Sequence, residues 1–202
     1  AGPAPTVVAR VELPEDPARR PPGVPPEPAL EPLRSFLARH GLPVFERHGA
    51  FRDVEILEDV GSHPLAVAAE GAPPAALRAL YSEACDLVPR LQRLVASPGE
   101  IPAFGRRLDA AHFGYKADFF QRWSLPSALG REPRPAESRV VHDAFAWIAN
   151  EAAAAPQRLA HRDFMGQNLH LRPGAPPGAR LVMIDLQGAF LAPPEYDLVC
   201  LL

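Results

Sequence analysis

His161-Arg162-Asp163-Phe164-Met165-Gly166-Gln167-Asn168 is followed, further along the chain, by the apolar run Leu181-Val182-Met183-Ile184 and then by Asp185. A carboxylate and an amide thus lie five residues apart in one short segment, and a second carboxylate ends an expected strand. Such oxygen donors are the ligands that Mg²⁺ prefers. Phosphoryl transfer from ATP needs one carboxylate to orient the acceptor hydroxyl, and an amide and a carboxylate to hold magnesium. The two stretches therefore predict a phosphoryl-transfer site.

The intervening residues predict a β-hairpin that joins these two stretches. Leu169-His170-Leu171 is expected to be a short strand, residues 173–178 a turn, and residues 181–184 the returning strand. The hairpin would bring the amide and the second carboxylate together at its open end. Pro193-Pro194-Glu195 predicts the start of a final helix, because proline suits a first turn and glutamate suits the positive end of a helix.

The N-terminal part predicts a small sheet and one helix. β-Branched and apolar runs predict three strands, and an apolar stripe at helical spacing predicts a helix that Gly41 ends. The proline-rich residues 14–28 predict a loop. The expected strands and helix span residues 6–13, 29–40, 45–50 and 54–57.

The middle of the chain predicts mainly helices, from apolar residues spaced three and four apart. The expected helices span residues 74–96, 115–125 and 137–155. Pro89 is expected to kink or break the first of them. Phe119, Phe120 and Trp123 could stack on a sugar face, but an aromatic cluster at helical spacing is more often core, so we expect these side chains and Ile148 to be buried.

This order of elements predicts an α+β fold with two lobes. The small N-terminal α+β lobe would span residues 1–60, and the larger, mainly helical lobe would span residues 61–202. A cleft between two such lobes is a natural ligand site. Because the chain has no initiating methionine and stops at Leu201-Leu202 within an apolar pattern, we expect it to be a portion of a longer protein with an incomplete small lobe.

Composition narrows the class of protein. The apolar fraction of 47% in 202 residues suits a globular protein, and a net charge of −3 gives no reason to expect nucleic acid or an anionic membrane as partner. No apolar run is long enough for a membrane span, and no signal peptide opens the chain. Cys85 and Cys200 have no metal-type spacing. A reducing, cytoplasmic location is expected, and nothing indicates an oligomeric state.

Three motifs resemble the aminoglycoside-phosphotransferase and choline-kinase group of the protein-kinase-like fold: residues 161–168, Ile184-Asp185-Leu186-Gln187 and Tyr196-Asp197-Leu198. Within this group they are most similar to bacterial kinases that phosphorylate N-acetylmuramate and N-acetylglucosamine at the anomeric position. Leu57-Glu58-Asp59-Val60-Gly61 resembles the hinge of the same family. The resemblance implies a two-lobed kinase-like fold, ATP and Mg²⁺ as cofactors, and a small-molecule substrate that is a sugar or an amino sugar.

The resemblance also implies roles for the residues of the predicted site. Asp163 would accept a hydrogen bond from the acceptor hydroxyl and orient it. Asn168 and Asp185 would hold Mg²⁺. Gln187 could contact the substrate or a metal-bound water, or be an ordinary surface residue. The alternative for the first three residues is a turn Asp, a turn Asn and a strand-end Asp without chemistry.

Two sets of supporting residues are implied as well. His161 and Arg162 would shape the loop, and Asp197 would accept hydrogen bonds from it. Glu58 and Val60 would offer backbone groups to adenine.

Arg10 stands where the family presents a lysine to the α- and β-phosphates. Its helix partner would be Glu31, with Glu27 as a rival, but an exposed strand arginine is an equal alternative.

Other features leave the function open. Gly188 stands where the sugar kinases usually have a second acid, and the glycine-rich hairpin that normally covers the phosphates is missing. One alternative is therefore a degenerate, kinase-like protein that binds nucleotide or regulates. Another is a kinase for an aminoglycoside or a choline-like alcohol. Arg106 and Arg107 could steer an anionic substrate, but a solvated pair is the simpler expectation.

Overall fold

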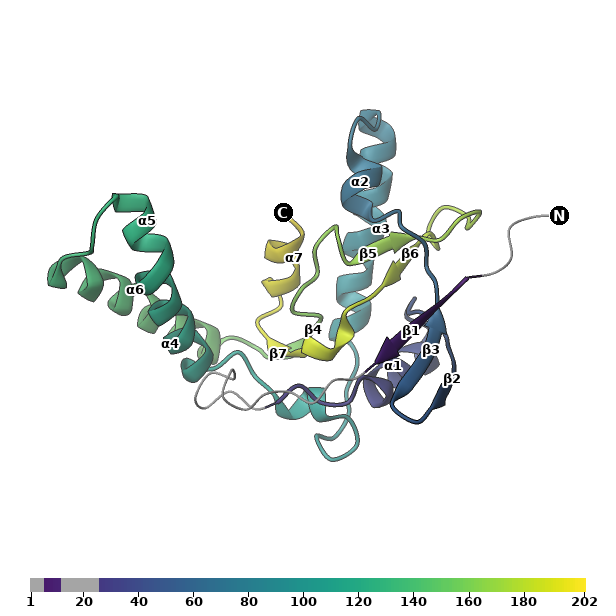
Figure 1. The fold of residues 1–202 in the computed structure, drawn as a ribbon, viewed down its shortest axis with the longest axis horizontal. Coiled ribbons are helices and arrows are strands. Elements are labelled where there is room, and N and C mark those ends of the chain that lie inside the picture. Colours follow the sequence, from purple (N-terminus) through teal and green to yellow (C-terminus); the bar gives the residue numbers. More distant parts are fainter. Residues whose placement is uncertain (1–5, 12–25) are drawn as a thin grey trace.

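A computed structural model describes residues 6–11 and 26–202, and its first part is a three-stranded antiparallel sheet with strand order β1-β3-β2 (Figure 1). The strands are β1 (Val7–Val11), β2 (Arg47–Phe51) and β3 (Val54–Glu58). All three predicted strands are therefore present. The predicted strand residues 12–13 and most of the predicted loop, residues 14–25, lie outside the described residues.

The sheet is accompanied by α1 (Leu30–Arg39), which confirms the predicted helix. Its apolar stripe of leucines and a phenylalanine is buried in the main core. Gly41 ends the helix as predicted: its φ of 73° is left-handed, and the N–H of Leu42 donates to the carbonyl of Leu37 at 3.0 Å.

The main core continues into α2 (Leu65–Ala69) and α3 (Pro74–Gln92). Pro74 occupies the first turn of α3, where its missing N–H costs no hydrogen bond. The prediction of a break at Pro89 is wrong, because α3 continues through this residue to Gln92, whereas the alternative of a kink stays a prediction. Pro89 lies in the last turn of the helix, so little helix remains beyond the hydrogen bond that it removes.

Helices α4 to α6 form an arm that projects away from the sheet (Figure 1). The elements between α3 and the end of the arm are η2 (Pro102–Gly105), α4 (Ala110–Phe119), the π-helical η3 (Phe120–Ser124), α5 (Leu125–Leu129) and α6 (Pro135–Ala154). The helix predicted at 115–125 thus begins earlier, at Ala110. Its start is set by Asp109, whose carboxylate accepts the N–H of His112 at 3.0 Å.

The expectation that the aromatic cluster is buried is wrong. Phe119 is 50%, Trp123 60% and Ile148 41% exposed. These helices pack against one another in the arm instead of entering the main core. Helical spacing identifies an apolar face, but it does not say whether another element covers that face.

The C-terminal part contains the predicted hairpin and final helix. Its elements are β4 (Arg158–Ala160), β5 (Leu169–Leu171), β6 (Leu181–Met183), η4 (Leu186–Gly188), β7 (Phe190–Ala192) and α7 (Tyr196–Leu201). Strands β5 and β6 pair antiparallel, and β4 pairs with β7. The hairpin also bonds to residues from the N-terminal part of the chain. The N–H of Met183 donates to the carbonyl of Pro43 at 2.8 Å, and the N–H of Leu171 donates to the carbonyl of His63 at 2.9 Å. The hairpin is therefore bound to the segments before β2 and after β3.

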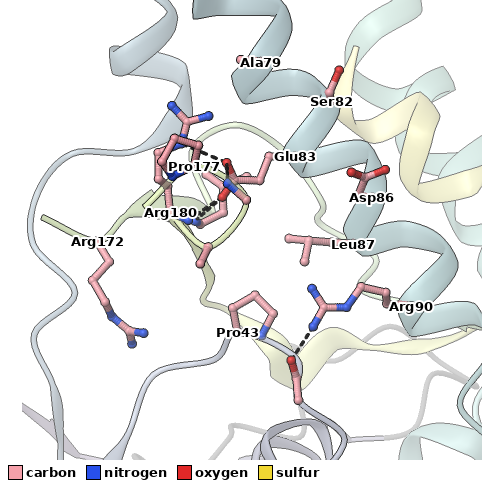
Figure 2. A pocket seen from close by; sticks show the side chains of 14 residues that line it. Pro43, Ala79, Ser82, Glu83, Asp86, Leu87, Arg90, Arg172, Pro177 and Arg180 are labelled. Atoms are coloured by element: carbon pink, nitrogen blue, oxygen red, sulfur yellow. Dashed lines mark hydrogen bonds and ion pairs between the residues drawn. The ribbon is translucent and has the colours of Figure 1, made fainter. Parts of the chain in front are cut away.

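Glu83 of α3 fixes the closed end of this hairpin (Figure 2). Its carboxylate is 7% exposed and accepts the N–H groups of Gly178, Arg180 and Leu181, as well as Nε of Arg180 at 2.9 Å. These groups border a cavity of about 430 Å³ in which none of the predicted site residues takes part. The carboxylate replaces the water that the turn's N–H groups would otherwise need.

Glu83→Ala is expected to lower the free energy of unfolding by about 3 kcal/mol, because it leaves three backbone donors and a guanidinium without their acceptor. Urea unfolding followed by circular dichroism measures this loss. Asp86→Ala, at an exposed position of the same helix, is the control and should change stability by less than about 0.5 kcal/mol. Equal losses in the two variants would show that the carboxylate does not hold the turn.

Among the helices of the described residues, none combines the length and apolar character that a bilayer crossing requires.

Candidate active site

Six of the predicted site residues line one cavity of about 450 Å³. They come from β1, from the segment at the end of β3, and from the open end of the β5–β6 hairpin. The six residues are Arg10, Glu58, Val60, Asn168, Asp185 and Gln187. Asp163 is not part of this lining, but the loop that carries it adjoins Asn168. The structure thus brings the two predicted metal-ligating side chains to the same space as the predicted hinge.

Part of the lining of this cavity is apolar. Val8, Leu57, Val60 and Ile184 contribute to its lining. The hinge is shaped by Asp59, whose Oδ1 accepts the N–H of Gly61 at 2.8 Å. Within the described part of the chain, the N–H of Val60 has no hydrogen-bond partner. Apolar walls beside an available backbone donor suit a planar heteroaromatic ring with an acceptor at its edge.

The buried carboxylate of Asp197 holds the backbone of the predicted catalytic loop. This carboxylate is 2% exposed and accepts the N–H of His161 at 2.8 Å and the N–H of Arg162 at 3.2 Å. Arg162 has a left-handed φ of 82°, a conformation that costs a non-glycine residue free energy. The two hydrogen bonds hold the backbone in that conformation.

The His161 side chain connects this loop to the end of β6. The ring is buried, and its Nε2 donates to the carbonyl of Ile184 at 2.8 Å. Burial lowers the pKa of His161, so the ring is neutral at pH 7. His161 therefore connects the residue before Asp185 to the loop that carries Asp163.

Burial raises the pKa of Asp197 to about 6, although its two backbone N–H partners act in the opposite direction. The folded protein then binds a proton more tightly than the unfolded chain does. Stability from this group is present below the unfolded pKa and is lost as the pH rises through the folded value.

We therefore expect the unfolding free energy of the wild type, relative to that of Asp197→Asn, to fall by about 2 kcal/mol between pH 4 and pH 7. Chemical denaturation of both proteins across this range measures the difference. A difference that stays constant with pH would show that Asp197 is not protonated in the acidic folded protein.

One hydrogen bond joins Asn168 to Asp163, and another joins Asn168 to the residue before Asp185. The amide nitrogen of Asn168 donates to the carbonyl of Asp163 at 2.9 Å, and its own backbone carbonyl accepts the N–H of Ile184 at 3.0 Å. Asp185 follows directly, with a left-handed φ of 61°. Its carboxylate is exposed and accepts a hydrogen bond from the amide of Gln187. An amide oxygen and a carboxylate facing one cavity are a donor set that fits Mg²⁺.

The predicted partners of Arg10 are wrong. Its guanidinium pairs with Glu55 at 2.8 Å, because the two residues face each other across β1 and β3. Glu31 instead pairs with Arg34 at 2.7 Å and lies 3.8 Å from Arg47, and Glu27 pairs with Arg162 at 3.0 Å. Arg10 still lines the cavity.

The Glu58 carboxylate, meanwhile, pairs with Arg172 of the hairpin at 2.8 Å. The backbone N–H of Glu58 donates to the carbonyl of Glu46 at 2.8 Å, so neither its carboxylate nor its N–H is available for the role predicted for it.

Arg106 is a site residue that sequence reasoning missed. The side chain was expected to be solvated, but it is only 9% exposed. Its Nη1 donates to the carbonyl of Gln187 at 3.2 Å and to the carbonyl of Ala189 at 3.4 Å. Burial lowers the pKa of this guanidinium. Arg106 thereby holds the segment that follows Asp185. Its sequence context, two adjacent arginines, does not distinguish this role from a solvated pair.

The sequence of residues 13–202 matches the phosphotransferase enzyme family. The chain belongs to this family. The fold predicted from the motifs, a small sheet with a larger helical part, is likewise that of solved family members. Aminoglycoside phosphotransferase APH(3'')-Id of Streptomyces rimosus, solved with ADP and streptomycin, superposes with a TM-score of 0.54 at 23% identity, covering 85% of this chain and 64% of that one.

Two curated family members are similar in sequence. The N-acetylmuramate/N-acetylglucosamine kinase of Pseudomonas putida is 28% identical over 122 residues, which are 60% of this chain and 33% of that protein. The enzyme of the same name from Neisseria meningitidis serogroup B is 29% identical over 125 residues, 62% of this chain and 34% of that protein. The chain thus spans about a third of the curated relatives that it matches.

Proposed function

We propose that this phosphotransferase family member is a kinase that transfers the γ-phosphate of ATP, with Mg²⁺, to a hydroxyl of a sugar or an amino sugar. The observation that carries the proposal is the convergence of the Asp163 loop and the Asp185 end of the hairpin. The carbonyl of Asp163 accepts a hydrogen bond from the side-chain amide of Asn168. The backbone carbonyl of Asn168 accepts one from the N–H of Ile184, the residue before Asp185. This connection supports Asp163 as the candidate base, with Asn168 and Asp185 as the candidate oxygen donors for a metal.

Each residue has a defined task in this proposal. The apolar cavity walls and the N–H of Val60 would hold the adenine, and the side chains of Asn168 and Asp185 would hold the metal. When bound, Mg²⁺ supplies charge neutralisation on the phosphates. Asp163 would accept the hydrogen bond of the acceptor hydroxyl and align its oxygen. It would take the hydroxyl proton as the new oxygen–phosphorus bond forms, while the bond from the γ-phosphorus to the β,γ-bridging oxygen breaks and ADP leaves with that oxygen.

The acceptor class is supported by the named curated relatives, both N-acetylmuramate/N-acetylglucosamine kinases. The solved relative with streptomycin supports the fold, and an aminoglycoside is a secondary acceptor candidate on the same proposal. We also propose that residues 1–60 and 61–202 act as two lobes around the cavity, and that the protein works in the cytoplasm on small molecules.

A second candidate function, nucleotide binding without transfer, is favoured by one observation. Arg10, the only predicted phosphate-binding cation from the sheet, is engaged by Glu55 at 2.8 Å. If that ion pair persisted with nucleotide bound, Arg10 would not be available to the phosphates.

A turnover screen of the full-length protein with Mg²⁺-ATP separates these functions. The panel contains N-acetylglucosamine, N-acetylmuramate, other sugars, aminoglycosides and choline. Acceptor-dependent ADP formation with the amino sugars supports the proposal. Nucleotide binding with no acceptor-dependent ADP formation anywhere in the panel supports the second candidate.

A further inference from the structure

The Arg162 guanidinium lies between two carboxylates. Its Nε donates to Oδ2 of Asp163 at 2.9 Å, and its Nη1 donates to Oε1 of Glu27 at 3.0 Å. Burial alone would lower the pKa of Arg162, but the charges of Asp163 and Glu27 outweigh it and raise the pKa above its ordinary value. Different nitrogens of one planar group serve the two partners, so the guanidinium fixes their relative geometry.

The space for this guanidinium exists because residue 188 is glycine. A Cβ atom at Gly188 would lie 2.8 Å from Cζ, 2.9 Å from Nε and 3.0 Å from Nη1 of Arg162. These distances are shorter than nonbonded contacts allow. Gly188 itself is buried, and the carbonyl groups on either side of it are held by Arg106. The backbone therefore cannot easily retreat, and any side chain at 188 would displace the guanidinium.

We propose that Glu27 and Arg162 are positioning residues for Asp163, and that Gly188 is required to seat them. This inference rests on the proposed function of Asp163 and adds a control of its orientation. Glu27 precedes α1 and is 135 residues from Arg162 in sequence. The orientation of the Asp163 carboxylate thus depends on the position of the chain segment that enters α1.

Gly188→Ala tests the proposal with little risk to folding, because the displaced atoms are the far end of a long side chain and not backbone. In the full-length protein we expect kcat to fall roughly 10-fold, since small displacements of a catalytic group are costly, while KM for ATP stays the same. Gly99→Ala is the matched control, because no atom lies within 4 Å of its added Cβ. Glu27→Gln should lower kcat by about 3-fold, as expected for a half-exposed ion pair.

Arg162→Lys supplies a second comparison. A lysine keeps the charge but has one ammonium group, which cannot hold both carboxylates in the fixed arrangement of the guanidinium. We expect the kcat of Arg162→Lys to be lower than that of the wild type. Wild-type kcat in Arg162→Lys or in Gly188→Ala would overturn the proposal.

A readout without turnover separates this inference from the proposed function. The ¹H–¹⁵N resonance of Arg162 Nε, assigned by its loss in Arg162→Lys, is expected to be protected from solvent exchange in the wild type and in Gly99→Ala. It should lose that protection in Gly188→Ala and in Asp163→Ala. Protection that persists in both variants would overturn the inference, whereas a wild type that binds nucleotide but transfers no phosphate would overturn only the proposed function.

Discussion

Asp163→Ala is expected to lower kcat for phosphoryl transfer by about 1,000-fold, because a positioned general base contributes roughly 10²- to 10⁴-fold to the rate. The side chain of Asp163 is not part of the main core. It is half-buried, and its carboxylate accepts a hydrogen bond from Arg162. The fold and the cavity that would hold ATP should therefore survive the substitution. Steady-state kinetics with the best acceptor of the screen measure the loss, and nucleotide titration measures the dissociation constant.

Two comparisons make this result specific. Asp163→Asn keeps the shape of the side chain and one acceptor oxygen for Arg162, so it should preserve the loop but remain nearly as slow as the alanine variant. Asp86→Ala, at an exposed position of α3, should leave kcat unchanged. Turnover at the wild-type rate in Asp163→Ala would remove Asp163 from the mechanism.

Asp185→Asn is expected to lower kcat on the order of 1,000-fold and to raise the Mg²⁺ concentration needed for half-maximal rate. A metal ion contributes several kcal/mol to charge stabilisation in such a transition state, and Asp185 is the charged member of the proposed donor pair. Asparagine is the appropriate replacement because residue 185 has a φ of 61°, which asparagine tolerates better than alanine does. Rates measured over a magnesium titration give both effects.

The control for this variant is Asp143→Asn, an exposed residue of α6 outside the cavity. It should follow the wild-type magnesium curve. If Asp185→Asn also follows that curve, the metal is held elsewhere and the hairpin has no part in binding it.

Local sequence patterns sufficed for the elements that carry these residues. The β5–β6 hairpin and α7 were predictable because apolar runs, turn residues and a proline-led helix start are near neighbours in the chain. The convergence of Asn168 and Asp185 follows from the hairpin alone. That part of the candidate site is therefore encoded locally.

The predictions that were wrong concern contacts between segments that are distant in the sequence. Arg10 meets Glu55 because of a strand register that no local pattern reveals. Glu27 meets Arg162 across 135 residues. Arg106 is buried only because the segment after Asp185 returns past it. The prediction that the aromatic side chains of the arm are buried was wrong for another reason. Their spacing is typical of a packed face, but the described residues provide no element that covers it.

The most direct test of the account follows the fate of the γ-phosphate itself. Full-length wild type and Asp163→Ala are incubated with Mg²⁺-ATP and N-acetylglucosamine or N-acetylmuramate, and ³¹P NMR records the products. We predict a sugar-phosphate resonance that grows with the wild type and is absent, within the same time, with Asp163→Ala. Equal growth in both samples, or nucleotide binding by the wild type without any sugar phosphate, would contradict the claim that the Asp163 loop and the Asp185 hairpin form a sugar-kinase active site.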